Sequence, residues 1–99
     1  GHPTLLLARR TEPMEKLGLK GSIVKKLDVT DEGAFAAAVA EGETEAGVPV
    51  ACLINNAGCM LLSGDTATQS SKEIDLMLSV NVKGVINGCK AVLTGMKKR

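Results

Sequence analysis

Short apolar runs alternate with helical segments along this chain, and that alternation most constrains its fold. Three runs, residues 4–8, 22–29 and 50–55, have the length of buried strands and are too short for buried helices. The segments between them, residues 12–19 and 31–45, have the length and polarity of helices. Strands joined by helical crossovers lie parallel. The sequence therefore predicts a βαβαβ unit, which is an α/β fold with a parallel sheet.

The last third of the chain predicts one long helix. Ser70 and Glu73 match a capping box at its start, and apolar residues then recur at helical spacing to about residue 96. The apolar residues of this stripe are Ile74, Leu78, Val82, Val85, Ile86, Cys89, Val92, Leu93 and Met96. Gly84 and Gly88 each cost the helix about 1 kcal/mol relative to alanine, so we expect a neighbour to approach closely there. A polar loop, residues 59–69, precedes the helix.

Composition argues against several classes of function. The 12 basic and 11 acidic side chains leave a net charge of +1, which gives no attraction for nucleic acid. Phe35 is the only aromatic residue, so bases have no stacking platform. His2 is the only histidine, which excludes a multi-histidine metal site. No run approaches the roughly 18 consecutive apolar residues of a membrane span, so we expect no nucleic acid, membrane or metal partner.

The three cysteines favour a reducing compartment. Cys52, Cys59 and Cys89 are odd in number and contain no C-x-x-C pair, so a disulfide framework or a cysteine zinc site is not expected. None has a histidine partner in the sequence, and we interpret them as small core residues rather than nucleophiles. The expected location is cytoplasmic.

Polar or small residues follow each predicted strand. Arg9 and Arg10 end the first, Asp28 and Val29 end the second, and Asn55-Asn56-Ala57-Gly58 ends the third. Ligands of open α/β sheets bind at the carboxyl ends of the strands, so these residues are candidates for a nucleotide site. Each also has an ordinary explanation taken alone: arginines as solvated charges, an aspartate as a turn or cap residue, and N-A-G as a turn.

Taken together, these residues resemble the short-chain dehydrogenase/reductase family. Residues 55–58 resemble its N-N-A-G motif, residues 5–10 its second strand and residues 27–31 its third strand. Residues 80–84 resemble the V-N-x-x-G stretch of the helix that follows. The Gly-His-Pro opening, the double arginine and the closing A-V-L-x-G-M resemble the NADP-dependent branch that includes 3-hydroxy acid and serine dehydrogenases. The resemblance implies a Rossmann-type doubly wound parallel sheet, with residues 1–99 as the central part of one NAD(P)-binding domain.

The resemblance implies NADP as the cofactor. NAD sites carry an acidic side chain at the end of the second strand, whereas arginine suits a 2′-phosphate, and this chain has Arg9 and Arg10 there. Asp28 would accept a hydrogen bond from the adenine amino group, and the amide of Val29 would donate to the ring. The small residues of the N-N-A-G motif would let the backbone pass close to the adenosine ribose.

Asn81 is the candidate catalytic residue. It is a poor helix former in the middle of the predicted helix, and its structural alternative is a buried asparagine bonded to neighbouring backbone. By resemblance it belongs to an Asn-Ser-Tyr-Lys tetrad, where it holds a water in the proton relay to the lysine. The resemblance also implies that the helix over residues 70–96 forms the main subunit interface of a homo-oligomer, a dimer or tetramer.

Two parts of the family's machinery do not occur in these 99 residues, the T-G-x-x-x-G-x-G turn and the active-site serine with Y-x-x-x-K. We therefore predict the central fragment of an oxidoreductase of about 250 residues that moves a hydride between NADP(H) and an alcohol or carbonyl. Residues 1–99 alone are predicted to be inactive. In the family a further strand lies between the first and third strands predicted here, and without it strand edges remain unpaired.

Other functions remain open at this point. One is a non-catalytic NADP-binding sensor, and another is an interaction module that acts through the long C-terminal helix. A receiver-like domain shares the α/β topology, but it needs a cluster of aspartates at strand ends, where this chain has only Asp28.

Overall fold

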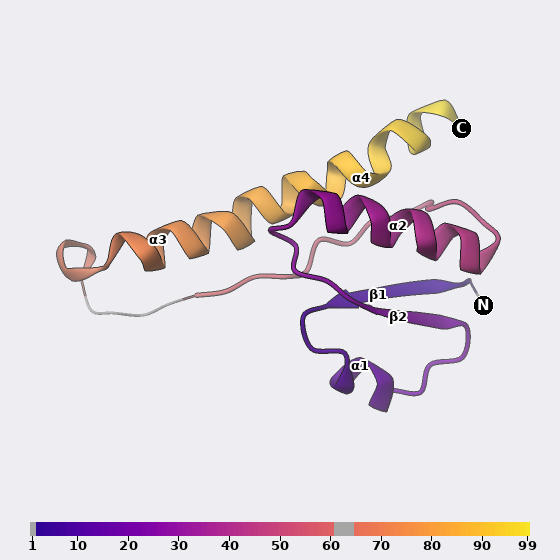
Figure 1. Cartoon of the computed structure of the whole chain (residues 1–99), viewed down its shortest axis with the longest axis horizontal. Helices are drawn as coiled ribbons and strands as arrows, with labels where there is room; N and C mark the ends of the chain where they lie inside the picture. The colour runs from indigo at the N-terminus through magenta and orange to yellow at the C-terminus, as the bar shows by residue number, and fades with distance from the viewer. Residues whose placement is uncertain (1, 61–64) are drawn as a thin grey trace.

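Two parallel strands and a layer of helices build the structure (Figure 1). The computed structural model describes residues 2–60 and 65–99, so residues 61–64 of the predicted loop lie outside the described residues. The elements are β1 Thr4–Ala8, α1 Glu12–Lys16, β2 Ser22–Lys26, α2 Glu32–Ala46, a 3-10 turn Thr66–Thr68, α3 Ser71–Leu78, a π-helical segment Ser79–Lys83 and α4 Gly84–Lys98. The α/β class predicted from the sequence is confirmed.

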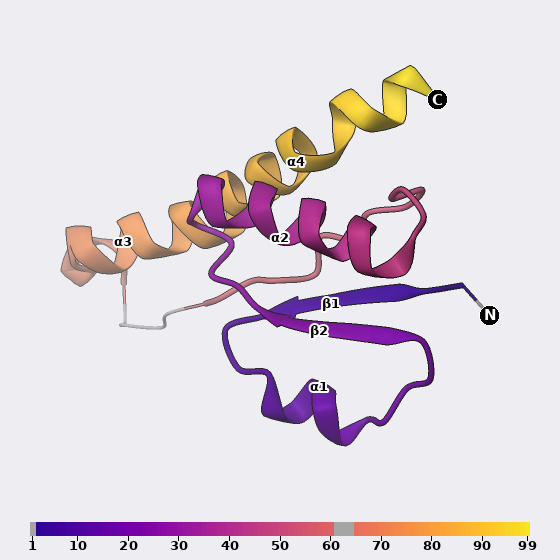
Figure 2. The same ribbon diagram turned by 45° about the vertical axis from the view of Figure 1, so that its right-hand side comes forward.

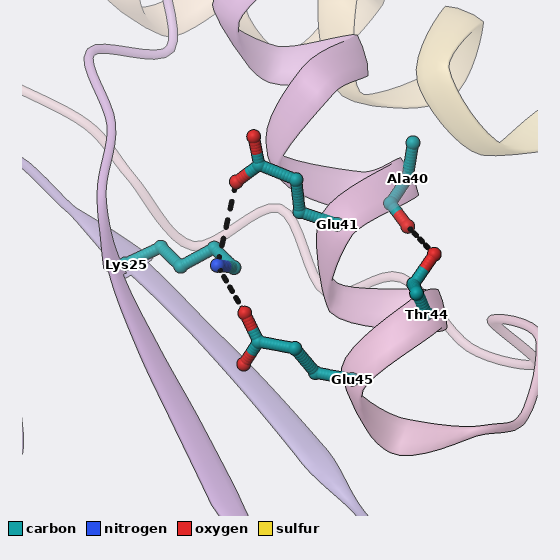
Figure 3. Close-up of polar contacts among 5 residues, drawn as sticks. All are labelled: Lys25, Ala40, Glu41, Thr44 and Glu45. Carbon is teal, nitrogen blue, oxygen red and sulfur yellow. Dashed lines mark hydrogen bonds and ion pairs between the residues drawn. The ribbon is translucent and has the colours of Figure 1, made fainter.

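The strands β1 and β2 form a parallel pair in which Leu6 lies opposite Val24. Helix α2 lies on one side of this pair and α1 on the other, in both views (Figures 1 and 2). Lys25 of β2 joins the sheet to α2, because its Nζ lies 2.7 Å from Glu45 Oε1 and 3.4 Å from Glu41 Oε2 (Figure 3). The crossover between β1 and β2 contains the helix α1, and the two strands pair in parallel, as predicted.

Residues 50–55, predicted as the third strand, are not part of the sheet. Among the described residues the sheet contains β1 and β2 alone. A strand needs a hydrogen-bonding neighbour about 4.8 Å away, and residues 50–55 pair with neither of these two strands. The segment is held by side chains instead: the Val50 N–H donates to Glu43 Oε1 at 2.8 Å, and the Val50 carbonyl accepts from Arg99 Nη2 at 2.6 Å. A pattern of apolar residues predicts an extended segment, and it does not say whether a pairing strand lies beside it.

The core lies between α2, α4 and the end of β2. Its buried apolar residues are Leu27, Phe35, Val39 and Val92, and Leu53 of the extended segment packs against them. Asp31 caps α2 through a 3.0 Å hydrogen bond from the Ala34 N–H to its Oδ1, as the sequence predicts.

The long helix begins as predicted but buries a different face. Ser70 Oγ accepts from the Glu73 N–H at 3.2 Å, and the helix continues from there to Lys98. The buried residues of α4 are Gly84, Asn87, Gly88 and Val92. Most of the predicted apolar stripe faces outward: Leu78, Val82, Ile86 and Leu93 are each about half exposed, at 55%, 51%, 52% and 47%.

The two glycines explain which face is buried. A Cβ on Gly84 would lie 2.7 Å from Val29 Cγ2, and a Cβ on Gly88 would lie 2.7 Å from Asn55 Oδ1. The close approach predicted for Gly84 and Gly88 is therefore confirmed. Because neither glycine has a side chain, the side chains of Val29 and Asn55 reach the helix itself, and α4 packs tightly there while most of its larger apolar residues lie outside.

The helix Ser71–Lys98 is long and apolar enough, by length and composition only, to cross a membrane, with a mean hydropathy of 1.2 over an 18-residue window within it. The sequence-based expectation rested on the absence of a long uninterrupted apolar run. The mean hydropathy of this helix is high although asparagines and glycines interrupt its apolar residues. Helices in protein cores and at subunit interfaces can have the same length and composition. This property therefore does not show whether the helix lies in a membrane.

Candidate functional site

The end of β2 presents an ionised carboxylate beside an arginine. Asp28 Oδ1 accepts from the Thr30 N–H at 3.0 Å and from the Thr30 hydroxyl at 2.7 Å. These bonds, and then the positive charge of Arg9, hold the pKa of Asp28 below its ordinary value of 3.8. The carboxylate is therefore charged at neutral pH, and Arg9 from the end of β1 lies within its electrostatic reach.

Val29 is fixed against α4 by a residue that the sequence analysis did not single out. Its carbonyl accepts a 2.9 Å hydrogen bond from Nδ2 of Asn87, and its side chain lies against Gly84. Asn87 is only 2% exposed. An asparagine next to a glycine within a helix, where both are poor helix formers, is the signal that could have identified it.

The N-N-A-G residues 55–58 lie on the surface along the same helix. Asn55 Nδ2 donates to Cys89 Sγ at 3.9 Å. Asn55 also lies over Gly88, and a Cβ on Gly58 would lie 3.3 Å from Asn81 Oδ1. Small residues on both sides therefore let this backbone pass close to the helix.

Asn81 joins the helix to the chain that follows the N-N-A-G motif. Its Oδ1 accepts from the Cys59 N–H at 2.8 Å, and its Nδ2 donates to the Cys59 carbonyl at 2.7 Å. The alternative role for Asn81 was a buried asparagine bonded to neighbouring backbone. The backbone bonds are present, but the residue is exposed rather than buried. It lies in the π-helical segment Ser79–Lys83, and such segments occur frequently at functional sites.

Helix α4 brings the two halves of the site together. Gly84 contacts Val29 at the end of β2, and Gly88, one turn further, contacts Asn55. The structure thus groups Arg9, Asp28 and Val29, and it groups residues 55–58 with Asn81. Arg10 is exposed after β1, and no hydrogen bond or ion pair joins its side chain to the other candidates among the described residues.

The cysteines differ from their predicted environment. Cys52 and Cys89 are exposed and Cys59 is half-buried, so the prediction that they are core residues is wrong for two of the three. Cys89 lies on the outward-facing side of α4, and within residues 2–60 and 65–99 no strand covers residues 50–55. No group of three or more His, Cys, Asp or Glu side chains that could hold a metal ion occurs among residues 2–60 and 65–99.

Comparison with known proteins decides the family. The family model for short chain dehydrogenases matches residues 1–99. The chain belongs to the short-chain dehydrogenase family. Oxidoreductase UcpA of Salmonella typhimurium is 43% identical over 75 residues, which are 75% of this chain and 27% of that protein.

Solved structures of the family agree with the fold. The crystal structure of serine dehydrogenase from Escherichia coli superposes with a TM-score of 0.88 at 28% identity, over 100% of this chain and 47% of that one. The closed form of a serine dehydrogenase complexed with NADP⁺ gives a TM-score of 0.81 at 27% identity, over 100% of this chain and 41% of that one. This short-chain dehydrogenase chain therefore spans less than half the length of each of these proteins. The predicted family and the partial Rossmann-type fold are confirmed.

Proposed function

We propose that this chain is the central part of an NADP(H)-dependent oxidoreductase that transfers a hydride between the cofactor and an alcohol or carbonyl substrate. The observation that carries the proposal is the grouping of Arg9, Asp28 and Val29 at the carboxyl ends of two parallel strands. This is the place where open α/β sheets bind nucleotides.

The described residues fit the adenosine half of such a cofactor. Asp28 uses Oδ1 for Thr30, and its Oδ2 makes no hydrogen bond to a described residue, which leaves an acceptor for an amino group. The Val29 N–H likewise finds no acceptor among the described residues. Together they offer one acceptor and one donor, the pair that the edge of an adenine ring requires.

Two observations support NADP over NAD. The end of β1 carries Arg9 and Arg10 and no carboxylate, and guanidinium groups match the geometry of a phosphate. A serine dehydrogenase of similar structure is complexed with NADP⁺. The arginines would therefore hold the 2′-phosphate, the only group that distinguishes the two cofactors.

The remaining site residues would lie between the adenosine ribose and the reacting end of the cofactor. Residues 55–58 would pass along the adenosine ribose, and Asn81 would hold a water for a proton relay completed by a serine, a tyrosine and a lysine from outside residues 1–99. The nicotinamide ring, when bound, supplies or accepts the hydride. The bonds from Asn81 to Cys59 keep the backbone beyond residue 58 against the helix, so Asn81 would position this loop in addition to holding the water.

The experiment that tests the function uses the complete protein that contains these residues. We expect it to oxidise NADPH in the presence of a panel of small aldehydes and ketones, at least tenfold more efficiently than NADH. Residues 1–99 alone contain no tyrosine and are expected to show no turnover. NADPH binding without turnover would favour the sensor, and no binding of either cofactor would favour an interaction module.

We also propose that a second copy of the protein covers the exposed apolar stripe of the long helix. Leu78, Val82, Ile86 and Leu93 lie about half exposed along it, which is a contiguous apolar surface of the kind that marks an interface. The covering of this stripe would also protect Cys89.

Replacing Ile86 with aspartate is expected to shift the complete protein from an oligomer to monomers, because it places a charge in the centre of that interface. Analytical ultracentrifugation measures the change. Lys97→Glu, which also alters charge on an exposed position of α4, is the matched control and should leave the oligomer intact. An Ile86→Asp variant of unchanged mass would contradict the assignment of this surface.

A further inference from the structure

The peptide group between Val29 and Thr30 is held at both of its polar ends. Its carbonyl accepts from Asn87 Nδ2 at 2.9 Å, and its N–H donates to Asp28 Oδ1 at 3.0 Å. A peptide group is planar, so the two hydrogen bonds lie on one rigid unit. Rotation of this unit would break both bonds, and the orientation of the Asp28 carboxylate is therefore coupled to the side chain of Asn87.

Asn87 provides a fixed support for that peptide. It is buried at 2% exposure, and a hydrogen bond shielded from water is stronger than the same bond on the surface. The helix around it is fixed as well, because Gly84 of α4 packs directly against the side chain of Val29. Asn87 thus transmits the position of α4 to the turn that follows β2.

The rest of the turn does not duplicate this support. The Thr30 hydroxyl also donates to Asp28 Oδ1, and the Asp31 N–H donates to the Asp28 carbonyl at 3.0 Å. Both bonds lie within residues 28–31 and would move together with the turn. The bond from Asn87 spans 58 residues of sequence and is the one hydrogen bond among the described residues that ties this turn to α4, whereas Asp31 ties it to α2.

From this geometry we infer that Asn87 is a positioning residue for the adenine half of the cofactor. Through the peptide between Val29 and Thr30 it orients the Asp28 carboxylate and the Val29 N–H toward the adenine edge, without touching the cofactor itself. The inference rests on the proposed function, because it assumes that this edge of the sheet binds an adenine nucleotide.

The test replaces Asn87 with leucine in the complete protein, which keeps the volume and removes the Nδ2 donor. Calorimetric titration with adenosine 2′,5′-bisphosphate, which carries only the adenosine half, is expected to show roughly tenfold weaker binding, the scale of one lost hydrogen bond. The KM for NADPH should rise by a similar factor, while kcat at saturating NADPH changes less than about twofold. The affinity for nicotinamide mononucleotide should not change.

Two further variants make the outcome decisive. Lys90→Gln removes the neighbouring ion pair of α4 with Glu32 and leaves the Val29 carbonyl bonded, so its binding of the bisphosphate should match the wild type. Asn87→Ser, whose shorter polar side chain does not reach the carbonyl, should reproduce the selective loss should the leucine variant not fold. Equal losses for both half-cofactors, or unchanged binding of the bisphosphate, would overturn the positioning role. A wild-type protein that binds no adenosine 2′,5′-bisphosphate would instead overturn the proposed cofactor and, with it, this inference.

Discussion

Replacing Arg9 and Arg10 together with alanine is expected to weaken NADP(H) binding by roughly a hundredfold or more and NAD(H) binding by less than about threefold. Each charge-assisted hydrogen bond to the 2′-phosphate contributes about 1.5–3 kcal/mol, and about 1.4 kcal/mol is a factor of ten in affinity. NAD lacks that phosphate, so it loses little when the arginines are removed. Titration of the complete protein with both cofactors measures the ratio.

The double variant Lys97→Ala, Lys98→Ala is the matched control for the arginine pair. It also removes two positive charges, from the end of α4 that lies away from the carboxyl ends of β1 and β2 (Figure 1). Its affinity for NADP(H) should stay within about twofold of wild type at 0.15 M salt, where charges separated by more than about 8 Å are largely screened. Equal losses for NADP and NAD in the arginine variant would show that Arg9 and Arg10 do not bind the 2′-phosphate.

Features that depend on neighbours in sequence were predictable. The bounds of β1 and the caps Asp31 and Ser70 follow from local patterns, because an apolar run and a capping bond involve residues only a few positions apart. The third strand was not predictable in the same way. Its ladder hydrogen bonds need a partner strand, and no pattern within residues 50–55 shows whether that partner lies beside them.

The buried face of the long helix shows a second limit. Periodicity identifies an apolar stripe, but it does not tell which face packs inward when glycines allow a closer approach. Here Gly84 and Gly88 face inward, and Leu78 and Ile86 face outward. The two glycines were the better signal of the buried face, because their cost to the helix is offset only where a neighbour packs closely against them.

In the candidate site, too, local features were predictable from the sequence and long-range contacts were not. The residue types at the strand ends could be identified from the sequence, and Arg9 lies close enough to Asp28 for its charge to help lower the pKa of that carboxyl. The anchoring roles of Asn81 and Asn87 could not be identified from the sequence. Asn81 bonds to a residue 22 positions away in the chain, and Asn87 bonds to one 58 positions away. The sequence indicates what chemistry an asparagine offers, and only the fold determines which backbone groups receive it.

Replacing Asn81 with leucine is expected to lower kcat by roughly 10²–10⁴, the usual contribution of a proton-transfer relay. Affinity for NADPH should change much less, because residues 55–58 and Asp28 keep their own contacts with α4 and Thr30. The Cys59 N–H and carbonyl lose their partners, but Asn81 is exposed and water can replace it. The free energy of unfolding should therefore fall by about 1 kcal/mol or less.

Stopped-flow turnover, cofactor titration and chemical denaturation of the complete protein separate the two roles of Asn81. Lys83→Gln, an exposed position in the same π-helical segment, is the matched control and should retain wild-type turnover. If Asn81→Leu unfolds more easily and turns over at the wild-type rate, Asn81 only anchors Cys59. If turnover falls at unchanged stability and cofactor affinity, the same side chain that holds the loop also serves the proton relay, because no loss of folding or binding accounts for the lower rate.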